Sequence, residues 1–375
     1  MRYDFEPYPF DKLRELLNGV KPNSAKKPIN LQIGEPQFET PKEILEVLNA
    51  HQKMFNKYPL SAGIPKLNEA QIGFVDRRFG IKLENNQILP TLGTREALFN
   101  FPQCLLFDIA NPAIAYPNPF YQIYEGAAKA SRARSVLLDL TRENSFKPDI
   151  TDRRLKDCDL VILNSPNNPT GSVLSLEELT EWAKLSEKFG FTLLSDECYS
   201  EIYDKEPPPS LLQAAIKASN AEFKNIIVMN SLSKRSSAAG IRSGFVAGDK
   251  NILRSYAKYR SYAGATSGVP LQIASAYAWL DDKHSDEIRL KYAKNMRLAQ
   301  KALNIDAPSA TFYLWIAVND DLKAAQELYK DQALCVLPGT FLARGKNPLG
   351  FLRVALVYEE SETIEALDRL KEYLQ

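Results

Sequence analysis

The feature that most constrains the fold is an alternation of short apolar runs with helical patterns between about residues 40 and 260. Apolar runs suited to buried strands occur at 114–116, 160–163, 192–194 and 226–229. Helical patterns occupy 41–55, 64–79 and 175–188, and the last opens with a capping box formed by Ser175 and Glu178. Strands that alternate with helices imply a mostly parallel sheet covered by helices on both faces, which is an α/β fold.

The pattern changes after about residue 265. Residues 270–301 have a helical pattern, short strands follow at 312–318 and 351–355, and a last helix is predicted at 360–374. That order is typical of an α+β module. We therefore predict a large domain at 41–265 and a smaller domain built from an N-terminal arm, 1–40, and the C-terminal third, 266–375. A chain of 375 residues is long enough for two such domains.

Composition excludes several classes of function. The net charge of +1 gives no basic surface for nucleic acid or an anionic membrane. No apolar run is long enough to span a bilayer, and the N-terminus lacks the pattern of a signal peptide. The two histidines, His51 and His284, are expected at the surface, so no metal site is predicted. The cysteines are widely scattered, which favours reduced thiols and a cytoplasmic protein; they are Cys104, Cys158, Cys198 and Cys335.

Lys234 is the residue that most directly indicates chemistry. It follows the apolar run 226–229 within Ser-Leu-Ser-Lys-Arg, and Arg242 follows within Gly-Ile-Arg-Ser-Gly. A lysine at the end of a buried strand can lose its proton and form a Schiff base with an aldehyde. An arginine nearby suits a phosphate, because its planar fork bonds two oxygens at once. Pyridoxal 5'-phosphate carries both groups, whereas the alternative for either residue alone is an ordinary surface cation.

Three other segments also follow predicted strands, where open parallel sheets place their ligands. Gly93, Thr94 and Arg95 open a helix whose free N–H groups suit a phosphate, although a plain turn would look the same. Asn168 lies in an Asn-Pro-rich loop and can donate an amide hydrogen bond to a cofactor ring oxygen.

Asp196 and Tyr199 form the remaining segment, just after the run 192–194. A carboxylate that faces the pyridine nitrogen keeps it protonated, which makes the ring an electron sink. Tyr199 can hydrogen-bond the ring hydroxyl. The alternative for Asp196 is a helix cap. Each segment has a plain structural alternative, but together and in this order they indicate a pyridoxal-phosphate site.

The same segments resemble the motifs of fold-type I pyridoxal-phosphate aminotransferases of class I/II, over nearly the whole chain. The matching stretches are Asn-Pro-x-Gly near Asn168, Asp-x-x-Tyr from Asp196 to Tyr199, Ser-x-Ser-Lys with Ser231, Ser233 and Lys234, and Gly-x-Arg-x-Gly around Arg242. The resemblance implies that 41–265 is the cofactor-binding domain and that Ser231 and Ser233 join the cofactor-binding set.

The resemblance also implies roles for four residues outside these motifs. Gly34 is expected where a backbone group meets the substrate carboxylate, and Arg353 where an arginine grips the α-carboxylate through two hydrogen bonds. Tyr121 is expected to stack on the cofactor. Tyr58 is expected to reach across a homodimer to the partner's phosphate, so that the two subunits share their active sites.

For the substrate, the segments Ser-Leu-Ser-Lys-Arg-Ser at 231–236 and Tyr-Arg-Ser-Tyr at 259–262 are similar to succinyldiaminopimelate aminotransferases of lysine biosynthesis. The chain departs from that pattern at Ser237, Ala239 and Ala263. Arg95 and Arg260 are the candidates to meet a distal carboxylate, and a solvated helix position is the alternative for Arg95.

The sequence thus predicts an aminotransferase that moves an amino group from an amino acid to a 2-oxo acid, with N-succinyl-L,L-diaminopimelate as the expected donor and 2-oxoglutarate as the acceptor. The alternatives are an aspartate or broad-specificity aminotransferase and a β-lyase that acts on sulfur amino acids. A transcription regulator built on this fold is a further alternative. It would need a basic DNA-binding extension, which residues 1–40 do not supply.

Overall fold

The computed structural model describes residues 5–345 and 350–375. Its larger part is built on a seven-stranded sheet with the order β2-β8-β7-β6-β5-β3-β4. The strands are β2 (Ile88–Thr91), β3 (Ala113–Asn118), β4 (Arg134–Asp139), β5 (Leu160–Asn164), β6 (Thr192–Asp196), β7 (Ile226–Ser231) and β8 (Gly244–Gly248). Neighbours pair in parallel except β8, which runs antiparallel to both β2 and β7. The prediction of a mostly parallel sheet is confirmed.

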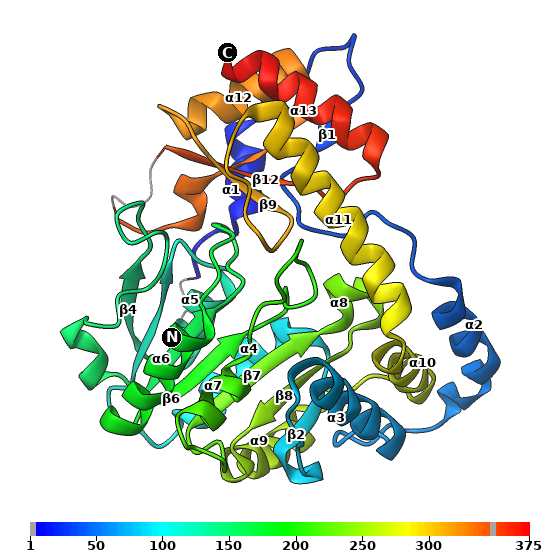
Figure 1. The fold of residues 1–375 in the computed structure, drawn as a ribbon, viewed down its shortest axis with the longest axis vertical. Helices are drawn as coiled ribbons and strands as arrows, with labels where there is room; N and C mark the ends of the chain where they lie inside the picture. The colour runs from blue at the N-terminus through cyan, green and yellow to red at the C-terminus, as the bar shows by residue number, and fades with distance from the viewer. Residues whose placement is uncertain (1–4, 346–349) are drawn as a thin grey trace.

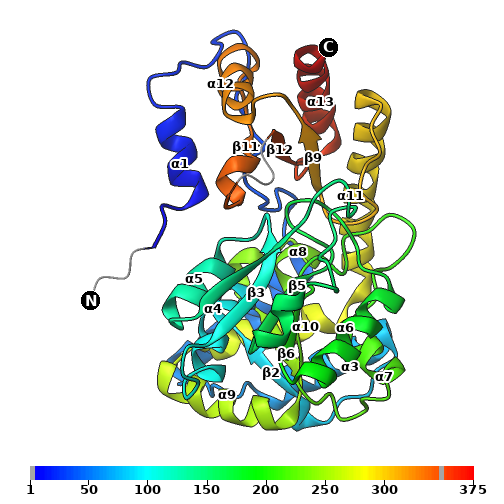
Figure 2. The same ribbon diagram turned by 90° about the vertical axis from the view of Figure 1, so that its left-hand side faces the viewer.

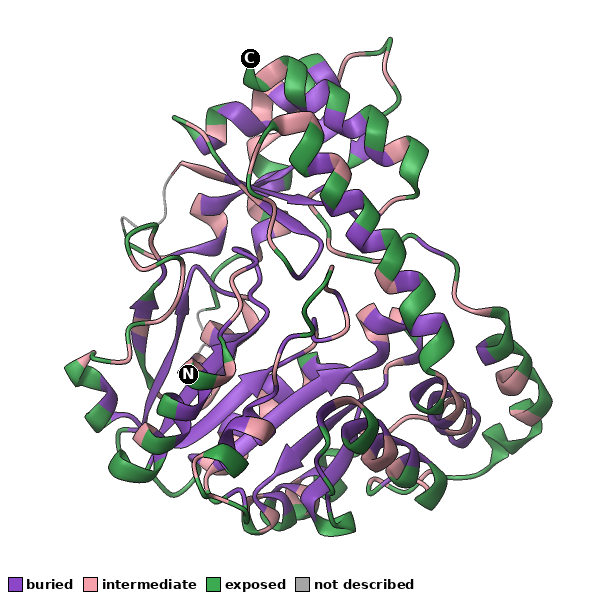
Figure 3. Cartoon of the chain, in the orientation of Figure 1, coloured by how far each residue is buried: buried purple, intermediate pink, exposed green. Residues whose placement is uncertain are grey.

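Helices cover both faces of this sheet (Figures 1 and 2). One face packs against α2 (Lys42–His51), α3 (Pro65–Phe79), α6 (Leu176–Phe189), α7 (Leu211–Lys217) and α10 (Val269–Leu280). The other packs against α4 (Gly93–Leu105), α5 (Ile123–Ala130) and α9 (Lys250–Ala263). Successive strand residues face opposite layers: Leu193 joins the first core and Leu194 the second. Figure 3 accordingly shows the central strands as buried, whereas the edge strand β4 is partly exposed.

The smaller part contains a three-stranded antiparallel sheet, β11 (Leu337–Pro338), β12 (Phe351–Ala355) and β9 (Tyr313–Ala317). Strand β1 (Ile29–Asn30) of the N-terminal arm pairs in parallel with β10 (Leu334–Cys335), and α1 (Pro9–Leu16) lies against β11. The smaller part also contains most of α11 (Asp282–Leu303) together with α12 (Asp321–Gln332) and α13 (Glu360–Leu374). The N-terminal arm and the C-terminal third therefore pack together.

Helix α10 corrects the boundary expected at residue 265. It packs on α2 and α3, and its Trp279 lies in the core of the larger part. The break comes instead at Asp281, the N-cap of α11, whose side chain accepts a hydrogen bond from the backbone N–H of Lys283. From there α11 runs from the larger part into the smaller one and packs against α13 (Figure 1). One helix thus connects the two parts of the molecule.

Candidate active site

A cavity of about 500 Å³ lies at the carboxyl ends of the parallel strands, between the large sheet and the smaller domain. The predicted site residues line it, except Gly93, Tyr58 and Arg260. They come from β6, β7, α4, α8, β12 and several loops, so residues from position 34 to position 353 meet in one place. This is the edge where open α/β sheets bind ligands.

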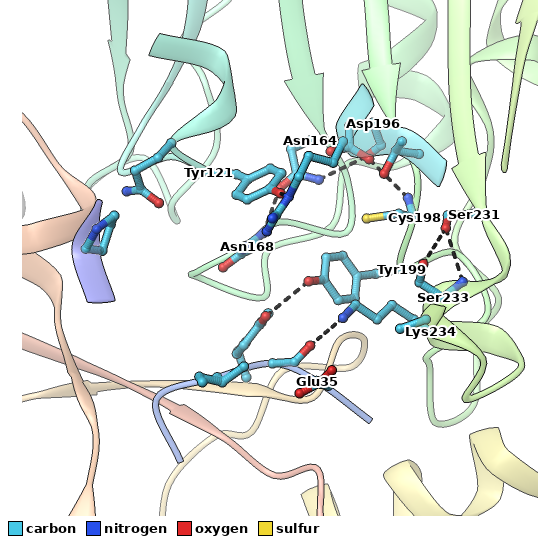
Figure 4. Close-up of a pocket in the computed structure, with 18 of the residues that line it drawn as sticks. Glu35, Tyr121, Asn164, Asn168, Asp196, Cys198, Tyr199, Ser231, Ser233 and Lys234 are labelled. Atoms are coloured by element: carbon cyan, nitrogen blue, oxygen red, sulfur yellow. Dashed lines mark hydrogen bonds between the residues drawn. The ribbon is translucent and has the colours of Figure 1, made fainter. Parts of the chain in front are cut away.

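Lys234 lies in the short helix α8 (Leu232–Arg235), directly after β7. Ser231 caps this helix by accepting a hydrogen bond from the backbone N–H of Ser233, at 3.1 Å. The Lys234 Nζ donates to the carbonyl of Gly34. Figure 4 shows the Lys234 and Tyr199 side chains extending towards the segment that carries Glu35. Burial lowers the pKa of the Lys234 ammonium to about 8, so a useful fraction is neutral and nucleophilic near neutral pH.

Asp196 ends β6 and is almost fully buried, with 2% of its surface exposed. Its carboxylate accepts hydrogen bonds from the Tyr124 hydroxyl at 2.8 Å and from the backbone N–H of Cys198 at 3.3 Å. Burial raises the pKa of the Asp196 carboxyl above its ordinary value, and the hydrogen bond from Tyr124 opposes that rise. The carboxylate is therefore held as an acceptor that can face a protonated ring nitrogen.

Tyr199 is buried beside the lysine and is paired with a second tyrosine. The hydroxyl oxygens of Tyr199 and Tyr313 are 3.1 Å apart. Gly34 passes so close to Tyr313 that a Cβ added at Gly34 would lie 1.8 Å from the Tyr313 hydroxyl oxygen. Glycine at position 34 therefore lets the arm approach both Tyr313 and Lys234.

A phosphate-sized corner forms where α4 begins. Gly93 has a φ of +73°, and a Cβ there would lie 2.8 Å from Nη2 of Arg242. Arg242 donates to the carbonyls of Ala239 and Leu92, both at 2.9 Å, which holds its guanidinium against the start of α4. The hydroxyls of Ser231 and Ser233 are 2.9 Å apart on the neighbouring strand end. These donors and the N-terminus of α4 form a suitable anion site.

Arg353 lies in β12 with 4% of its surface exposed. Its Nη1 donates to Asn168 Oδ1 at 2.9 Å and its Nη2 to the Gln32 carbonyl at 2.6 Å, whereas its Nε is buried without a partner. The side chain stacks on Tyr313, with Cζ 4.5 Å from the ring centroid. Among the described residues, no carboxylate pairs with this buried cation. The Arg353 guanidinium is thus a buried cation that can bind an incoming carboxylate.

Asn168 is held by the residues behind it. Its backbone N–H donates to Asn164 Oδ1 at 2.7 Å, and Asn164 Nδ2 donates to the Asp196 carbonyl at 2.9 Å. The loop that positions Asn168 and Arg353 is therefore fixed to the same strand end that carries Asp196.

Arg95, Tyr121 and Tyr8 line another part of the cavity wall. Arg95 Nε donates to the Tyr121 hydroxyl at 2.7 Å, and its guanidinium lies 6.0 Å from the Tyr8 ring centroid. Its two Nη atoms donate no hydrogen bond to any residue in 5–345 or 350–375. Arg95 is thus a second cation in the cavity with capacity for an anionic group. Tyr121 is placed by Arg95 at the cavity wall.

Two predicted residues lie elsewhere. The Tyr58 side chain is fully exposed and contributes nothing to the cavity of its own chain. Arg260 is 1% exposed, and its guanidinium bonds the Pro90 carbonyl at 2.6 Å, the Ala265 carbonyl and Glu96 at 3.3 Å. The structure corrects the expectation that Arg260 meets substrate: its donors are occupied inside the protein.

The structure also adds residues that sequence reasoning missed. Tyr124, Tyr313, Asn164, Cys198 and Tyr8 all line the cavity. The sequence contains one signal, the three-residue spacing of Tyr121 and Tyr124, whose ring centroids lie 5.9 Å apart in the structure. Tyr313 and Tyr8 reach the site only through the packing of the smaller domain.

His284 is the other correction. It was expected at the surface but has only 5% of its surface exposed. In the part of the chain that the structure describes, no group of His, Cys, Asp and Glu side chains is arranged to hold a metal ion. Nor does any helix in residues 5–345 and 350–375 have the length and apolarity needed to cross a bilayer.

The donors in the cavity fit pyridoxal 5'-phosphate. The corner formed by Arg242, Ser231, Ser233 and the start of α4 suits the phosphate. Asp196 suits the ring nitrogen and Lys234 the aldehyde carbon. The cavity is large enough for this group and an amino acid together.

Comparisons with known proteins agree with this chemistry. The family described as aminotransferase class I and II matches residues 26–370. An LL-diaminopimelate aminotransferase of Natranaerobius thermophilus is 30% identical, covering 98% of this chain and 97% of that protein. An aspartate aminotransferase of Pyrococcus horikoshii is 28% identical, with 97% and 94% covered.

Two solved structures are similar over almost their whole length. The aminotransferase AspB of Helicobacter pylori has a TM-score of 0.96 at 50% identity, covering 98% of each chain. An aminotransferase of Neisseria meningitidis has a TM-score of 0.92 at 39% identity, covering 99% of this chain and 98% of that one.

Proposed function

Because the chain belongs to the class I and II family of pyridoxal-phosphate-dependent aminotransferases, we propose that it transfers the amino group of N-succinyl-L,L-diaminopimelate to 2-oxoglutarate. The family membership makes the protein an aminotransferase that uses pyridoxal 5'-phosphate and acts on small amino and oxo acids. We propose, beyond this membership, which amino donor the enzyme uses and what each site residue does.

The proposed mechanism rests on five side chains of this protein. Bound pyridoxal 5'-phosphate supplies an aldehyde that takes up an amine and a ring that withdraws electrons. Lys234 would take the proton from the substrate α-carbon, since its lowered pKa of about 8 suits a general base. Asp196 holds the proton on the ring nitrogen. Tyr199 and Asn168 orient the ring through its oxygen. Arg353 holds the α-carboxylate.

The observation that carries the substrate proposal is the pair of cations in one cavity. Arg353 has an unpartnered Nε, and Arg95 has two unpartnered Nη atoms. A donor with a second carboxylate remote from the α-carbon satisfies both. The succinyl group provides that carboxylate on a long arm, and the segments 231–236 and 259–262 support the same donor. Because the donors of Arg260 are occupied inside the protein, Arg95 is the remaining candidate to bind the distal carboxylate.

A second candidate is an enzyme for LL-diaminopimelate or aspartate, because relatives with those names cover nearly the whole chain. Both compounds also carry a second carboxylate, but on a shorter arm. A β-lyase would share the cofactor site and would release ammonia and pyruvate instead of passing nitrogen to an oxo acid.

We propose that the active enzyme is a homodimer with shared sites. Tyr58 is fully exposed and lies in an exposed apolar segment with Phe55 and Leu60, which are 58% and 68% exposed. Tyr262, 87% exposed, lies in a neighbouring segment. That segment contacts the Tyr58 segment, because the Thr266 hydroxyl donates a hydrogen bond to the Leu60 carbonyl. A second subunit would cover this surface and receive Tyr58 at its phosphate corner. The free thiols support a cytoplasmic enzyme.

The test is a donor panel with 2-oxoglutarate, in wild type, Arg95→Ala and the control Arg153→Ala. Arg153 is exposed and lies outside the cavity. We expect N-succinyl-L,L-diaminopimelate to have the highest kcat/KM, and Arg95→Ala to lower it roughly ten- to hundredfold, the effect of losing a charge-assisted contact. A preference for aspartate would overturn the succinylated donor. An equal loss for long and short donors would overturn the role of Arg95.

A further inference from the structure

The three residues that follow Lys234 are each fastened by their side chains to segments near the junction of the two parts. Arg235 is 2% exposed, and its guanidinium packs against the rings of Phe74 and Trp279, at 4.9 and 5.4 Å from their centroids. Its Nη1 donates to the Ala278 carbonyl at 2.6 Å, and its Nη2 pairs with Asp282 Oδ1 at 3.0 Å. Arg235 thereby joins α8 to the end of α10 and the start of α11.

Ser236 makes the second connection, to His284 in the first turn of α11. The Ser236 Oγ lies 2.8 Å from His284 Nε2, and His284 Nδ1 lies 2.9 Å from Asp281 Oδ2. The hydrogen bond with His284 helps to lower the pKa of Asp281, which keeps its carboxylate ionised against the effect of burial. An ionised carboxylate only accepts, so His284 Nδ1 carries a proton. Burial lowers the pKa of His284, so the ring is neutral and its Nε2 accepts from the Ser236 hydroxyl.

This order of serine, histidine and aspartate does not form a nucleophilic site. Ser236 has no exposed surface and does not line the cavity. His284 is 5% exposed. A substrate therefore has no path to the hydroxyl, and the three side chains serve to fix the position of the backbone instead.

Ser237 makes the third connection, to the arm that follows Gly34. Its hydroxyl donates to the Phe38 carbonyl, and its own carbonyl accepts from the Thr40 hydroxyl at 2.7 Å. In the same arm, the Gly34 carbonyl accepts a hydrogen bond from the Lys234 Nζ. The segment 235–237 is thus held by α11 on one side and by the arm on the other, and both continue into the smaller domain (Figure 1).

We propose that His284 is a positioning residue for Lys234: through Ser236 it fixes the backbone of α8 to the start of α11, the helix that connects the two parts of the molecule. The inference rests on the proposed role of Lys234. Proton transfer by Lys234 requires its amine to be held accurately against the substrate. A less firmly held α8 therefore lowers the rate of that step. Binding of the α-carboxylate at Arg353 is left intact, because β12 lies outside this connection.

The test compares Ser236→Ala and His284→Gln with a matched control, Ser186→Ala. Ser186 is also fully buried and also donates one hydrogen bond, to the Phe191 carbonyl at 2.7 Å, but it lies in α6 away from the lysine. The side-chain amide oxygen introduced by His284→Gln can still accept from Ser236, so this conservative variant is expected to keep most of the function. Amide hydrogen exchange of residues 234–237 is measured with and without pyridoxal 5'-phosphate, and kcat and KM are measured in parallel.

We expect Ser236→Ala to speed exchange at 234–237 at least tenfold over Ser186→Ala, and to lower kcat roughly tenfold or more with little change in KM. Exchange no faster than in the control overturns the connection. Faster exchange with unchanged kcat overturns its effect on Lys234. Exchange requires no turnover, so its result stands whether or not Lys234 is the base; a Lys234→Ala enzyme with normal kcat would instead overturn the proposed function.

Discussion

Tyr124→Phe is the most informative single substitution for the proposed mechanism. It removes the 2.8 Å hydrogen bond that the Tyr124 hydroxyl donates to Asp196 and leaves the ring in place between its aromatic neighbours. Of the two hydrogen bonds that the described residues donate to this buried carboxylate, the 3.3 Å bond from the backbone N–H of Cys198 would remain. Burial, which already raises the pKa of Asp196, would act with less opposition.

The expected magnitude follows from the kind of bond lost. A hydrogen bond to a charged group contributes about 1.5–3 kcal/mol, which corresponds to roughly a ten- to hundredfold loss of kcat if the ionised form of Asp196 is required. The direction of the shift in the pH profile also follows from this bond. The bond from Tyr124 lowers the pKa of Asp196, so its loss raises that pKa and moves the acid limb of the kcat profile to higher pH. Asp196→Asn should lower kcat further than Tyr124→Phe does, because no carboxylate remains.

The assay is steady-state turnover from pH 5 to pH 9 with saturating cofactor. Tyr116→Phe is the control, since Tyr116 is a buried tyrosine of the same apolar core that does not line the cavity. We expect only Tyr124→Phe to shift the acid limb. If the two variants have the same pH profile and the same kcat, the argument that Tyr124 tunes Asp196 is refuted.

Three further predictions concern the arm, the lysine and the dimer. Gly34→Ala should lower kcat/KM at least tenfold by displacing Tyr313, whereas Gly126→Ala, with only ordinary contacts, should not; equal activities would contradict the close approach. In the apoprotein, the rate at which Lys234 reacts with an aldehyde should rise as the pH passes through about 8, and an inflection near 10.5 would contradict burial as its cause. Mixing inactive Tyr58→Phe and Lys234→Ala subunits should restore activity if Tyr58→Phe is itself severely impaired, and no recovery after proven exchange would exclude shared sites.

Local patterns in the sequence were sufficient for much of the fold. The capping box of Ser175 and Glu178 placed the start of α6 correctly, and the apolar runs of β5, β6 and β7 fell where the structure has them. The last helix, predicted at 360–374, has the bounds of α13. These elements have strong local signals, namely caps and continuous apolar runs. The direction of β8 has none, because an apolar strand reads the same whether it runs parallel or antiparallel.

Contacts between distant segments set the limit of prediction. Helix α10 looks like the start of a helical C-terminal module, but its apolar face packs on α3 in the larger part. Arg260 has the sequence position of a free helical cation, but in the structure its guanidinium bonds Glu96 and three backbone carbonyls. Tyr313 reaches the site because β12 pairs with β9 beside Arg353. The motifs around Lys234, Asp196 and Asn168 were visible in sequence because each lies at the end of a strand or shortly after it.

The most direct test of the central claim is reduction of the purified holoenzyme with borohydride, followed by peptide mapping. The account predicts a yellow protein whose colour is lost on reduction, with the cofactor fixed to the peptide that contains Lys234 and to no other lysine. Recovery of the label on a different lysine, or a protein that takes up no pyridoxal 5'-phosphate, would contradict the assignment of this cavity as the active site.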